Sequence, residues 1–375
     1  MKPIIKYPGG KEKELKHIKP LIPSSINCYY EPFFGGGAVF FGIDNYYNAR
    51  INDKSDELIN LYENISSCNS DFIKYLHQLD RMWKLFSDFI DKNQESVLNL
   101  YSSIITIDDF LRDNKDKIYY VFKYFFINNS SFLKAFRNYV PDKLKRIYDH
   151  ENKDNSLNDV KAILDNIECA FKGAIYCRLR TEYNNRNSLK LNNSLKAALF
   201  LFQREYCYSS MFRYNLDGEF NVPYGGISYN RKYLSSKIEL INSNECLNKF
   251  KNVTICCDDF YSFMKKYVPQ KSDFIFLDPP YDTEFSSYSG NSFSKDDQKR
   301  LADYLINDCY ANWMVVIKST DYICSLYKNG TSTKNGGKIL VQGFDKKYNV
   351  SFMNRNQKDC EHLIITNYPC KQEDK

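Results

Sequence analysis

The feature that most constrains the fold is a short apolar run that stops abruptly on an acid and two prolines, FIFLDPPY at residues 274–281. Such a run predicts a strand that is buried on both faces of a parallel sheet. Pro279 and Pro280 have no N–H to donate to a ladder, so the strand must end before them. Ligands of open α/β sheets bind beyond the carboxyl ends of the strands, where Asp278 and Tyr281 fall. A surface acid in an ordinary turn is the alternative, and the tripeptide DPP alone favours it.

The composition indicates a globular chain with room for more than one core. Of 375 residues, 43% are hydrophobic and 16% are aromatic, which is enough apolar material for two domains. No apolar run approaches the roughly 20 residues of a membrane span, and the first residues lack a signal-peptide core. We therefore expect a soluble protein of the cytoplasm that has no contact with a membrane.

Cysteine usage and charge narrow the functional class only a little. The 12 cysteines include no C-x-x-C pair and are accompanied by only 4 histidines, so we expect reduced thiols and no metal site. The net charge of +6 is compatible with a polyanion partner. Lys, Asn, Ile and Tyr are all abundant, as a codon bias would produce, so the charge alone does not identify that partner.

Two glycine turns lie near the N-terminus. The first, KYPGGK at residues 6–11, presents two lysines and a ring, and a ligand site and a solvated turn explain it equally well. Residues 28–41 predict a strand, a glycine turn and a helix start, a unit that brings main chain close to a nucleotide-like ligand. Phe40 stands where a dinucleotide fingerprint has its third glycine, which favours a cofactor with a nucleoside and no phosphates. A glycine turn that serves only tight packing is the alternative.

Acids follow two further predicted strands. Asp53 ends the strand at residues 49–52, about 20 residues past the glycine turn, where a ribose diol is typically held. It is also a candidate N-cap of the helix that follows. The strand at residues 253–257 leads to Asp259 and Phe260, an acid and a ring that could accept the amino proton of an adenine and stack on its face. An acid placed at a helix N-terminus is the alternative for Asp259.

Residues 66–246 differ in character from both ends of the chain. Helical periodicities alternate there with polar segments and no βαβ rhythm is visible, so we expect an inserted, mainly helical domain. Within it, residues 206–226 predict a β-hairpin in which Asp217 and Gly218 supply positive φ values. Arginine can pair with a guanine edge and asparagine with a phosphate or a base, so this hairpin suits a DNA duplex. A surface hairpin with structural tyrosines is the alternative.

Four separated motifs together resemble the Dam-type DNA adenine-N6 methyltransferases, the D12 class, in its α group. They are KYPGGK at residues 6–11, EPFFGGG at 31–37, RYN with FNVPYG at 213–225, and DPPY at 278–281. Their order is similar to that of the α group, with the glycine motif first, the target-recognition insert next and DPPY last. The resemblance covers both ends of the chain, and the insert only from about Tyr176 onward.

The resemblance implies a seven-stranded, Rossmann-like S-adenosylmethionine-dependent methyltransferase fold at residues 1–65 plus 247–375, with a target-recognition domain at 66–246. It implies methyl transfer from S-adenosyl-L-methionine to N6 of a flipped adenine in double-stranded DNA, without a metal. The implied catalytic residues are Asp278, Pro279, Pro280 and Tyr281. The implied cofactor residues are Tyr7, Lys11, Glu31, Pro32, Phe33, Phe34, Gly35, Gly37, Asp53, Asp259, Phe260 and Asp278. The implied DNA-binding residues are Lys6, Tyr208, Ser209, Met211, Arg213, Asn215, Asn221 and Pro223.

Two departures from the family pattern leave the recognised DNA sequence open, because Ser209 and Met211 stand where Asn and Leu are usual. The alternatives are amino-methylation of cytosine N4 or of RNA, and a non-catalytic DNA-binding relict. The hairpin motif favours DNA and adenine, and the intact glycine and DPPY motifs argue against a relict. We expect a monomer, nucleoid-associated in a prokaryote or phage-infected cell, with a separately encoded restriction endonuclease as a candidate partner.

Overall fold

The chain forms two compact units in the computed structural model, which describes residues 1–123, 125, 129–154, 159–281, 293–347 and 359–369. The first, here called the sheet unit, consists of Met1–Glu63 and Asn248–Lys375. The second, the helical unit, consists of Asn64–Leu247. Their boundaries fall inside two helices, α3 (Asp56–Ser66) and α12 (Asn244–Lys249).

In the described part of the chain, seven strands form one sheet in the order β3-β2-β1-β4-β5-β7-β6. The neighbours from β3 to β5 are parallel, and β7 runs antiparallel between β5 and β6. The predicted α/β fold with seven strands is therefore confirmed, and the mostly parallel sheet is consistent with a methyltransferase fold. The strands are β1 (Ile26–Glu31), β2 (Tyr46–Asn52), β3 (Val253–Cys256), β4 (Phe274–Leu277), β5 (Asn312–Lys318), β6 (Leu340–Lys347) and β7 (Asp359–Thr366).

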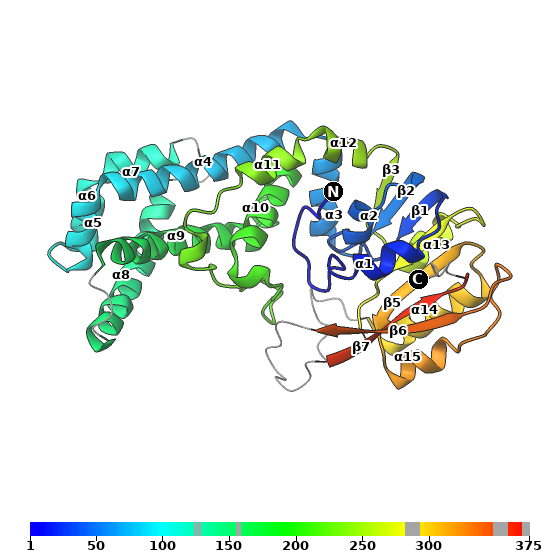
Figure 1. Cartoon of the computed structure of the whole chain (residues 1–375). Coiled ribbons are helices and arrows are strands. Elements are labelled where there is room, and N and C mark those ends of the chain that lie inside the picture. The colour runs from blue at the N-terminus through cyan, green and yellow to red at the C-terminus, as the bar shows by residue number, and fades with distance from the viewer. Residues whose placement is uncertain (124, 126–128, 155–158, 282–292, 348–358, 370–375) are drawn as a thin grey trace. The chain divides into compact units, whose positions relative to one another are not determined.

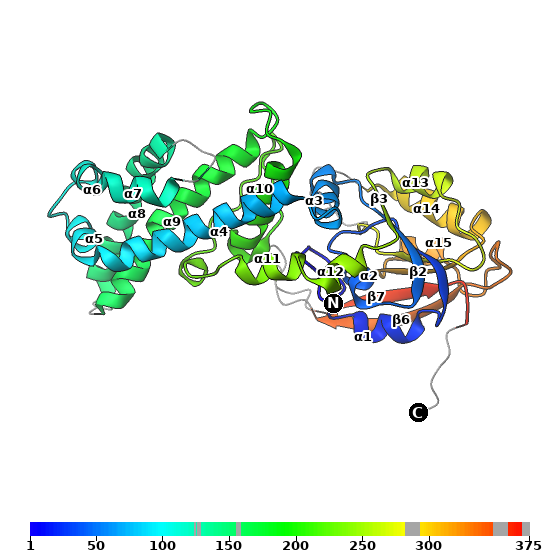
Figure 2. The same ribbon diagram turned by 90° about the horizontal axis from the view of Figure 1, so that it is seen from above.

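Helices cover both faces of this sheet. Alternate strand residues point to opposite sides, so each face carries apolar side chains that the helices bury. Ile275 and Trp313 pack with α13, α14 and α15 in one buried cluster. On the other face, the ring of Tyr29 lies 6.5 Å from that of Phe40 in α2. Figure 2 shows α13 and α14 on one side of the strands and α1 on the other. These elements are α1 (Leu15–Ile18), η1 (Lys19–Leu21), α2 (Ala38–Gly42), α13 (Phe260–Lys266), α14 (Lys295–Asn307) and α15 (Asp321–Leu326).

The helical unit has its own aromatic core. Rings of Phe86, Phe136 and Phe171, from α4, α8 and α9, lie 5.1 to 5.7 Å apart between centroids. No helix among the described residues is long and apolar enough to cross a membrane. The helices that lie wholly within the helical unit are α4 (Ser70–Lys92), α5 (Gln94–Tyr101), α6 (Ile107–Asp113), α7 (Lys115–Phe122), α8 (Asn129–Asp154), α9 (Val160–Asn184), α10 (Asn193–Tyr206), η2 (Tyr208–Ser210), η3 (Ile227–Tyr229) and α11 (Ser235–Ile241).

Residues 206–226 fold back on themselves between α10 and η3. Antiparallel bridges join Cys207 to Tyr224 and Tyr214 to Phe220. Gly218 has a φ of 76°, whereas Asp217 is not among the residues with positive φ, so the expectation of two positive φ values in this turn is wrong. A three-residue hairpin loop needs only one left-handed residue after its type I turn, and Gly218 provides it.

Candidate functional site

Four parallel strands of the sheet unit, β1 to β4, end at the same edge, and one buried asparagine at the end of β2 joins the segments that follow β1 and β3. The Asn52 amide donates to the carbonyl of Pro32 at 3.0 Å and to that of Asp258 at 2.9 Å. Its oxygen accepts from the Asp258 N–H at 2.9 Å. Asn52 was not among the site residues predicted from the sequence. A polar residue that closes a buried strand was the available signal.

The glycine turn between β1 and α2 depends on two left-handed residues. Gly35 and Gly37 have φ values of 49° and 66°, which side chains disfavour. A Cβ on Gly37 would lie 2.5 Å from the Phe34 ring, and one on Gly35 would lie 3.0 Å from the Tyr7 ring. The turn therefore packs closely on its own phenylalanine and on the KYPGGK segment.

Asp53 ties the end of β2 to this turn. One carboxylate oxygen accepts from the Gly35 N–H at 2.8 Å and the other from the Ser55 N–H at 2.9 Å. Burial raises the pKa of the Asp53 carboxyl above its usual value, while the two main-chain N–H groups act against that rise. Ser55 precedes α3, and its hydroxyl accepts from the Leu58 N–H at 3.4 Å, so the capping role falls to Ser55.

Glu31, the last residue of β1, is 2% exposed and forms hydrogen bonds on both sides of the same turn in the sequence. One of its carboxylate oxygens accepts from the Tyr29 hydroxyl at 2.7 Å and from the Phe40 N–H at 3.2 Å. Burial raises the pKa of Glu31 to about 8. These bonds join β1 to the first turn of α2, across the glycine segment between them.

An aromatic cluster lies beside the turn. The Phe33 ring lies 5.4 Å from that of Phe260 and 5.5 Å from that of Phe293, between centroids. Asp259 caps α13 by accepting from the Tyr261 N–H, as its alternative interpretation predicts. The Arg300 guanidinium bonds the other Asp259 oxygen at 2.9 Å and lies 4.7 Å from the centre of the Phe260 ring. Phe293 and Arg300 were missed, because no local pattern links α14 and the residues before it to α13.

The first motif and the last meet at Lys11. Its ammonium lies 2.5 Å from an Asp278 carboxylate oxygen, 2.8 Å from the Gly9 carbonyl and 3.3 Å from the Tyr281 hydroxyl. The Lys11 side chain is 2% exposed and that of Asp278 is 20% exposed. Lys11 therefore places a buried positive charge on the carboxylate that follows β4.

The DPPY segment is held from two further elements. The Gln298 amide of α14 donates to the Pro280 carbonyl at 2.7 Å. The Tyr281 ring packs edge-on against His362 of β7, with 5.6 Å between centroids. Pro279 is buried, whereas Pro280 is exposed. Helix α14 and strand β7 thus fix the two sides of the segment that carries Asp278.

The residues implied to contact DNA belong to both units. Lys6 is an exposed residue of the sheet unit, and the other seven lie on the hairpin of the helical unit. There the Arg213 guanidinium donates to the Asn221 side chain at 2.8 Å and to its carbonyl at 3.0 Å. Both residues therefore share one fixed arrangement across the hairpin.

The stretch that enters the hairpin has an unusual backbone. Ser209 and Ser210 have φ values of 52° and 51°, a conformation that non-glycine residues rarely adopt. Tyr208, which precedes them, is exposed, and its N–H donates to the Pro223 carbonyl at 2.9 Å. Met211 is half-buried. Asn215, at the tip, accepts from the Glu219 N–H at 2.8 Å.

Comparison with known proteins decides the family. The model of the D12 class N6 adenine-specific DNA methyltransferases matches residues 7–170 and 126–340. The chain belongs to this family. The match includes residues 66–170, for which the sequence had shown no recognisable counterpart. The prediction of an adenine-specific DNA methyltransferase is confirmed, against the alternatives of cytosine or RNA amino-methylation and of a non-catalytic relict.

Proteins similar to this methyltransferase come from a virus, an archaeon and a bacterium. The Type II methyltransferase M.CviBI of Paramecium bursaria Chlorella virus NC1A is 26% identical over 98% of this chain and 100% of its own length. The Type II methyltransferase M.MjaIII of Methanocaldococcus jannaschii is 26% identical over 81% of this chain and 79% of its own. The DNA adenine methylase of Serratia marcescens is 27% identical over 80% of this chain and 75% of its own.

Proposed function

We propose that this methyltransferase transfers a methyl group from S-adenosyl-L-methionine to N6 of an adenine flipped out of duplex DNA. Residues 1–65 plus 247–375, which include the whole sheet unit, act as the catalytic domain, and residues 66–246, which lie within the helical unit, act as the target-recognition domain. The observation that carries this proposal is the Asp278 carboxylate at the end of β4, paired with the buried Lys11 ammonium at 2.5 Å.

The residues around the glycine turn fit S-adenosylmethionine. Gly35 and Gly37 adopt left-handed conformations and leave room for the Tyr7 and Phe34 rings, so the turn at the end of β1 is a tight one built from main chain. The Asp53 carboxylate can accept hydrogen bonds from ribose hydroxyls, because each oxygen retains a lone pair beyond its main-chain bond. Phe33 and Phe260 offer rings for an adenine face. Phe40 in place of a third glycine agrees with a cofactor that has no phosphates.

The reaction requires the protein to activate a poor nucleophile. The N6 lone pair of adenine is delocalised into the ring, and it becomes available when both amino protons are held by acceptors. We assign these acceptors to the Asp278 carboxylate and the Pro279 carbonyl, and stacking on the extruded base to Tyr281. S-adenosylmethionine supplies an already activated methyl group, so alignment matters more than a strong base. The N6–C bond would form as the methyl–sulfur bond breaks, with its electron pair left on the thioether sulfur, and N6 would then lose one amino proton to solvent.

Lys11 contributes electrostatics to this arrangement. Its ammonium pairs with the Asp278 carboxylate and orients it toward the place where positive charge would develop on N6. The Gly9 carbonyl and the Tyr281 hydroxyl fix the ammonium in turn. Base flipping costs a few kcal/mol, which contacts from the hairpin and stacking on Tyr281 offset.

The names of two relatives, both Type II methyltransferases, support a modification role beside a separately encoded restriction endonuclease. We propose that the enzyme acts as a monomer on DNA in the cytoplasm. The site-specific modification of DNA that this role requires would be tested by sequencing the genome of an expressing cell for modified bases and their context. Methylation confined to one short motif supports it, and methylation at every adenine contradicts it.

The experiment that tests the chemistry combines nucleoside analysis with an Asp278→Ala variant. Mass spectrometry of a duplex treated with wild-type enzyme should show N6-methyladenine. The variant should bind labelled S-adenosylmethionine yet transfer no methyl group, while Asp296→Ala, at an exposed acid of α14, retains wild-type turnover. Wild-type turnover by Asp278→Ala would falsify the mechanism, and failure of the wild-type enzyme to bind S-adenosylmethionine would remove the cofactor assignment.

A further inference from the structure

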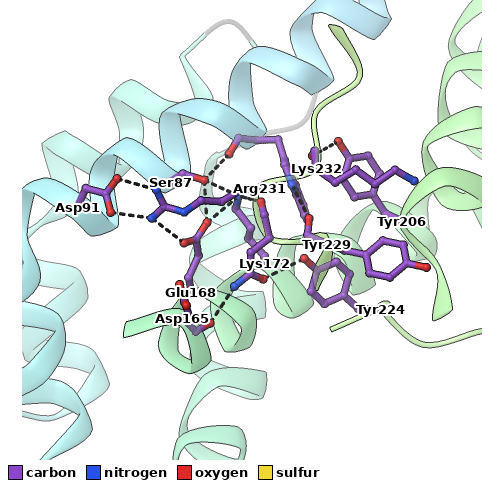
Figure 3. A network of polar contacts seen from close by, with 12 residues as sticks. Ser87, Asp91, Asp165, Glu168, Lys172, Tyr206, Tyr224, Tyr229, Arg231 and Lys232 are labelled. Atoms are coloured by element: carbon purple, nitrogen blue, oxygen red, sulfur yellow. Dashed lines mark hydrogen bonds and ion pairs between the residues drawn. The ribbon is translucent and has the colours of Figure 1, made fainter. Parts of the chain in front are cut away.

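A polar cluster lies in the helical unit, on elements outside the hairpin itself, with Ser87, Glu168 and Lys172 buried and Asp91 and Arg231 about half exposed. Trp83, Ser87 and Asp91 follow one another at four-residue spacing on α4, and Glu168 and Lys172 do so on α9. Residues four apart share one face of a helix, so each helix presents a polar stripe. Figure 3 shows the two stripes meeting around Lys172 and Arg231.

Lys172 is the centre of this cluster, and its side chain is fully buried. Its ammonium donates to the Ser87 hydroxyl at 2.6 Å and to the Asn230 carbonyl, and it pairs with Glu168 at 2.9 Å. It also lies 4.7 Å from the centre of the Trp83 ring. Burial lowers the pKa of Lys172 to about 8, although Glu168 opposes that change. Every donor direction of the ammonium is thus used inside the protein.

Residues of the same cluster form hydrogen bonds with three consecutive residues that follow the hairpin, residues 229–231. The Trp83 indole donates to the Tyr229 carbonyl at 3.4 Å. The Asn230 carbonyl accepts from Lys172. Arg231 donates to both carboxylate oxygens of Asp91, at 3.0 and 2.7 Å, and pairs with Glu168 at 3.2 Å. Figure 3 shows Arg231 between these two acids. Helices α4 and α9 therefore hold residues 229–231 through main chain and side chains alike.

The Asn230 side chain connects this cluster to the hairpin. Its side-chain nitrogen donates to the Asp165 carbonyl at 2.8 Å, and its side-chain oxygen accepts from the Tyr224 hydroxyl at 3.1 Å. Tyr224 is bridged to Cys207 across the base of the hairpin. Two residues before Tyr224, the Val222 carbonyl accepts from the Tyr176 hydroxyl of α9 at 3.0 Å. A continuous set of bonds thus leads from Lys172 to the base of the hairpin.

A buried ion pair of this kind is weak evidence for stability alone. Desolvation of both charges offsets much of their attraction, and well-packed apolar residues of similar volume are often equally stable. The pair does fix geometry, because the ammonium must meet three acceptors at once. One of those acceptors belongs to the chain that leaves the hairpin.

We propose that Lys172, with Glu168, is a positioning residue for target recognition. It fixes the returning strand of the hairpin through Asn230 and Tyr224, and so sets where Arg213 and Asn221 meet the DNA. The inference rests on the proposed function, in which the hairpin reads the duplex. It gives residues 66–170 a role, since α4 and the first part of α9 supply Ser87, Asp91 and Glu168.

The test uses a Lys172→Met, Glu168→Gln double variant of the full chain. Removal of both charges leaves no unpaired ion, because Arg231 keeps its pairing with Asp91, and the single amide oxygen of the glutamine can still accept from Ser87 or from Arg231. We expect discrimination between the preferred duplex and duplexes with one changed base pair to fall about tenfold in kcat/KM. The KM for DNA should rise more than kcat falls, and S-adenosylmethionine affinity should stay within about twofold, because its proposed site lies in the other unit.

The matched control is the Arg178→Met, Glu182→Gln double variant. This pair lies on the same helix at the same four-residue spacing, partly exposed at 23% and 11%. We expect it to keep the wild-type discrimination ratio. If the Lys172→Met, Glu168→Gln double variant does not fold, a Tyr224→Phe variant provides the test. It loses one hydroxyl and keeps the ring, and it should also lower discrimination.

The outcomes separate the inference from the function on which it rests. Should the Lys172→Met, Glu168→Gln double variant lose activity equally on all duplexes, or keep full discrimination, the positioning role is wrong. Should Arg213→Ala also keep full discrimination, the hairpin does not read the sequence and that part of the proposed function fails instead. Loss of discrimination in Arg213→Ala, in the Lys172 double variant and in Tyr224→Phe supports both.

Discussion

The Lys11 ammonium lies 2.5 Å from a carboxylate oxygen of Asp278, although 267 residues separate the two in the chain. The helical unit is inserted between the motifs that carry them. The parallel order of β1 and β4 brings the ends of these strands together, so the segments near them can share one site. The pair links a glycine-rich N-terminal turn to the acid proposed for catalysis.

Replacement of Lys11 should slow chemistry more than binding. Lys11→Met retains the length of the side chain and removes the charge that faces Asp278. We expect the single-turnover rate of methyl transfer to fall by about 100-fold, a typical loss for one preorganised group. The measurement is a rapid-quench assay with saturating DNA and S-adenosylmethionine. Lys13→Met, at an exposed lysine in the same segment, serves as the control and should retain the wild-type rate.

Loss of Asn52 should loosen the cofactor site. Asn52→Leu removes three bonds that hold the segments after β1 and β3, and it leaves the buried Pro32 carbonyl and the partly buried carbonyl and N–H of Asp258 without that partner. We expect unfolding to become easier by about 2 to 4 kcal/mol and S-adenosylmethionine to bind at least tenfold more weakly. Urea unfolding and equilibrium binding would measure both. Asn48→Ala, at an exposed position of the same strand, should change neither, and equal effects of the two variants would contradict the assignment.

The sequence predicts the parts of this site that depend on local patterns. The run at residues 274–277 forms β4 and ends at the prolines, because apolar periodicity and the missing N–H act over a few residues. The contacts of Asn52 and Arg300 depend on strand order and helix packing, which no neighbouring residue encodes. Lys11 was assigned to the cofactor, and only the folded sheet shows its pairing with Asp278. Asp217 was misjudged because a D-G pair fits both two-residue and three-residue loops.

Arg213→Ala should relax discrimination at one base pair and leave others unchanged. The structure fixes this guanidinium on Asn221, so its directions toward a partner are limited. A bidentate contact with a guanine edge is worth about 1 to 3 kcal/mol of discrimination. Methylation rates on a panel of duplexes, each with one changed base pair, would locate the effect. Arg112→Ala, at an exposed arginine of α6, is the control. The prediction fails if all duplexes weaken equally.

The pH dependence of stability should report the buried carboxyl of Glu31. Burial raises its folded-state pKa to about 8, whereas an unfolded glutamate titrates near 4.5. Between these values the unfolded chain releases a proton that the folded protein retains. This contribution to stability is therefore fully present below the unfolded pKa and is lost as the pH rises through the folded pKa. At about 1.4 kcal/mol per unit, the loss between pH 5 and pH 8 is at most roughly 4 kcal/mol.

The Glu31→Gln variant should lack this part of the pH dependence. A glutamine oxygen can still accept from the Tyr29 hydroxyl and the Phe40 N–H, so the packing at the end of β1 is retained. The measurement is urea unfolding at several pH values between 5 and 8, with Glu12→Gln, at an exposed acid, as the control. The raised pKa of Asp53 contributes equally to all three proteins and cancels in the comparison. If the wild-type protein and Glu31→Gln lose stability in parallel as the pH rises, Glu31 does not retain its proton in the folded state.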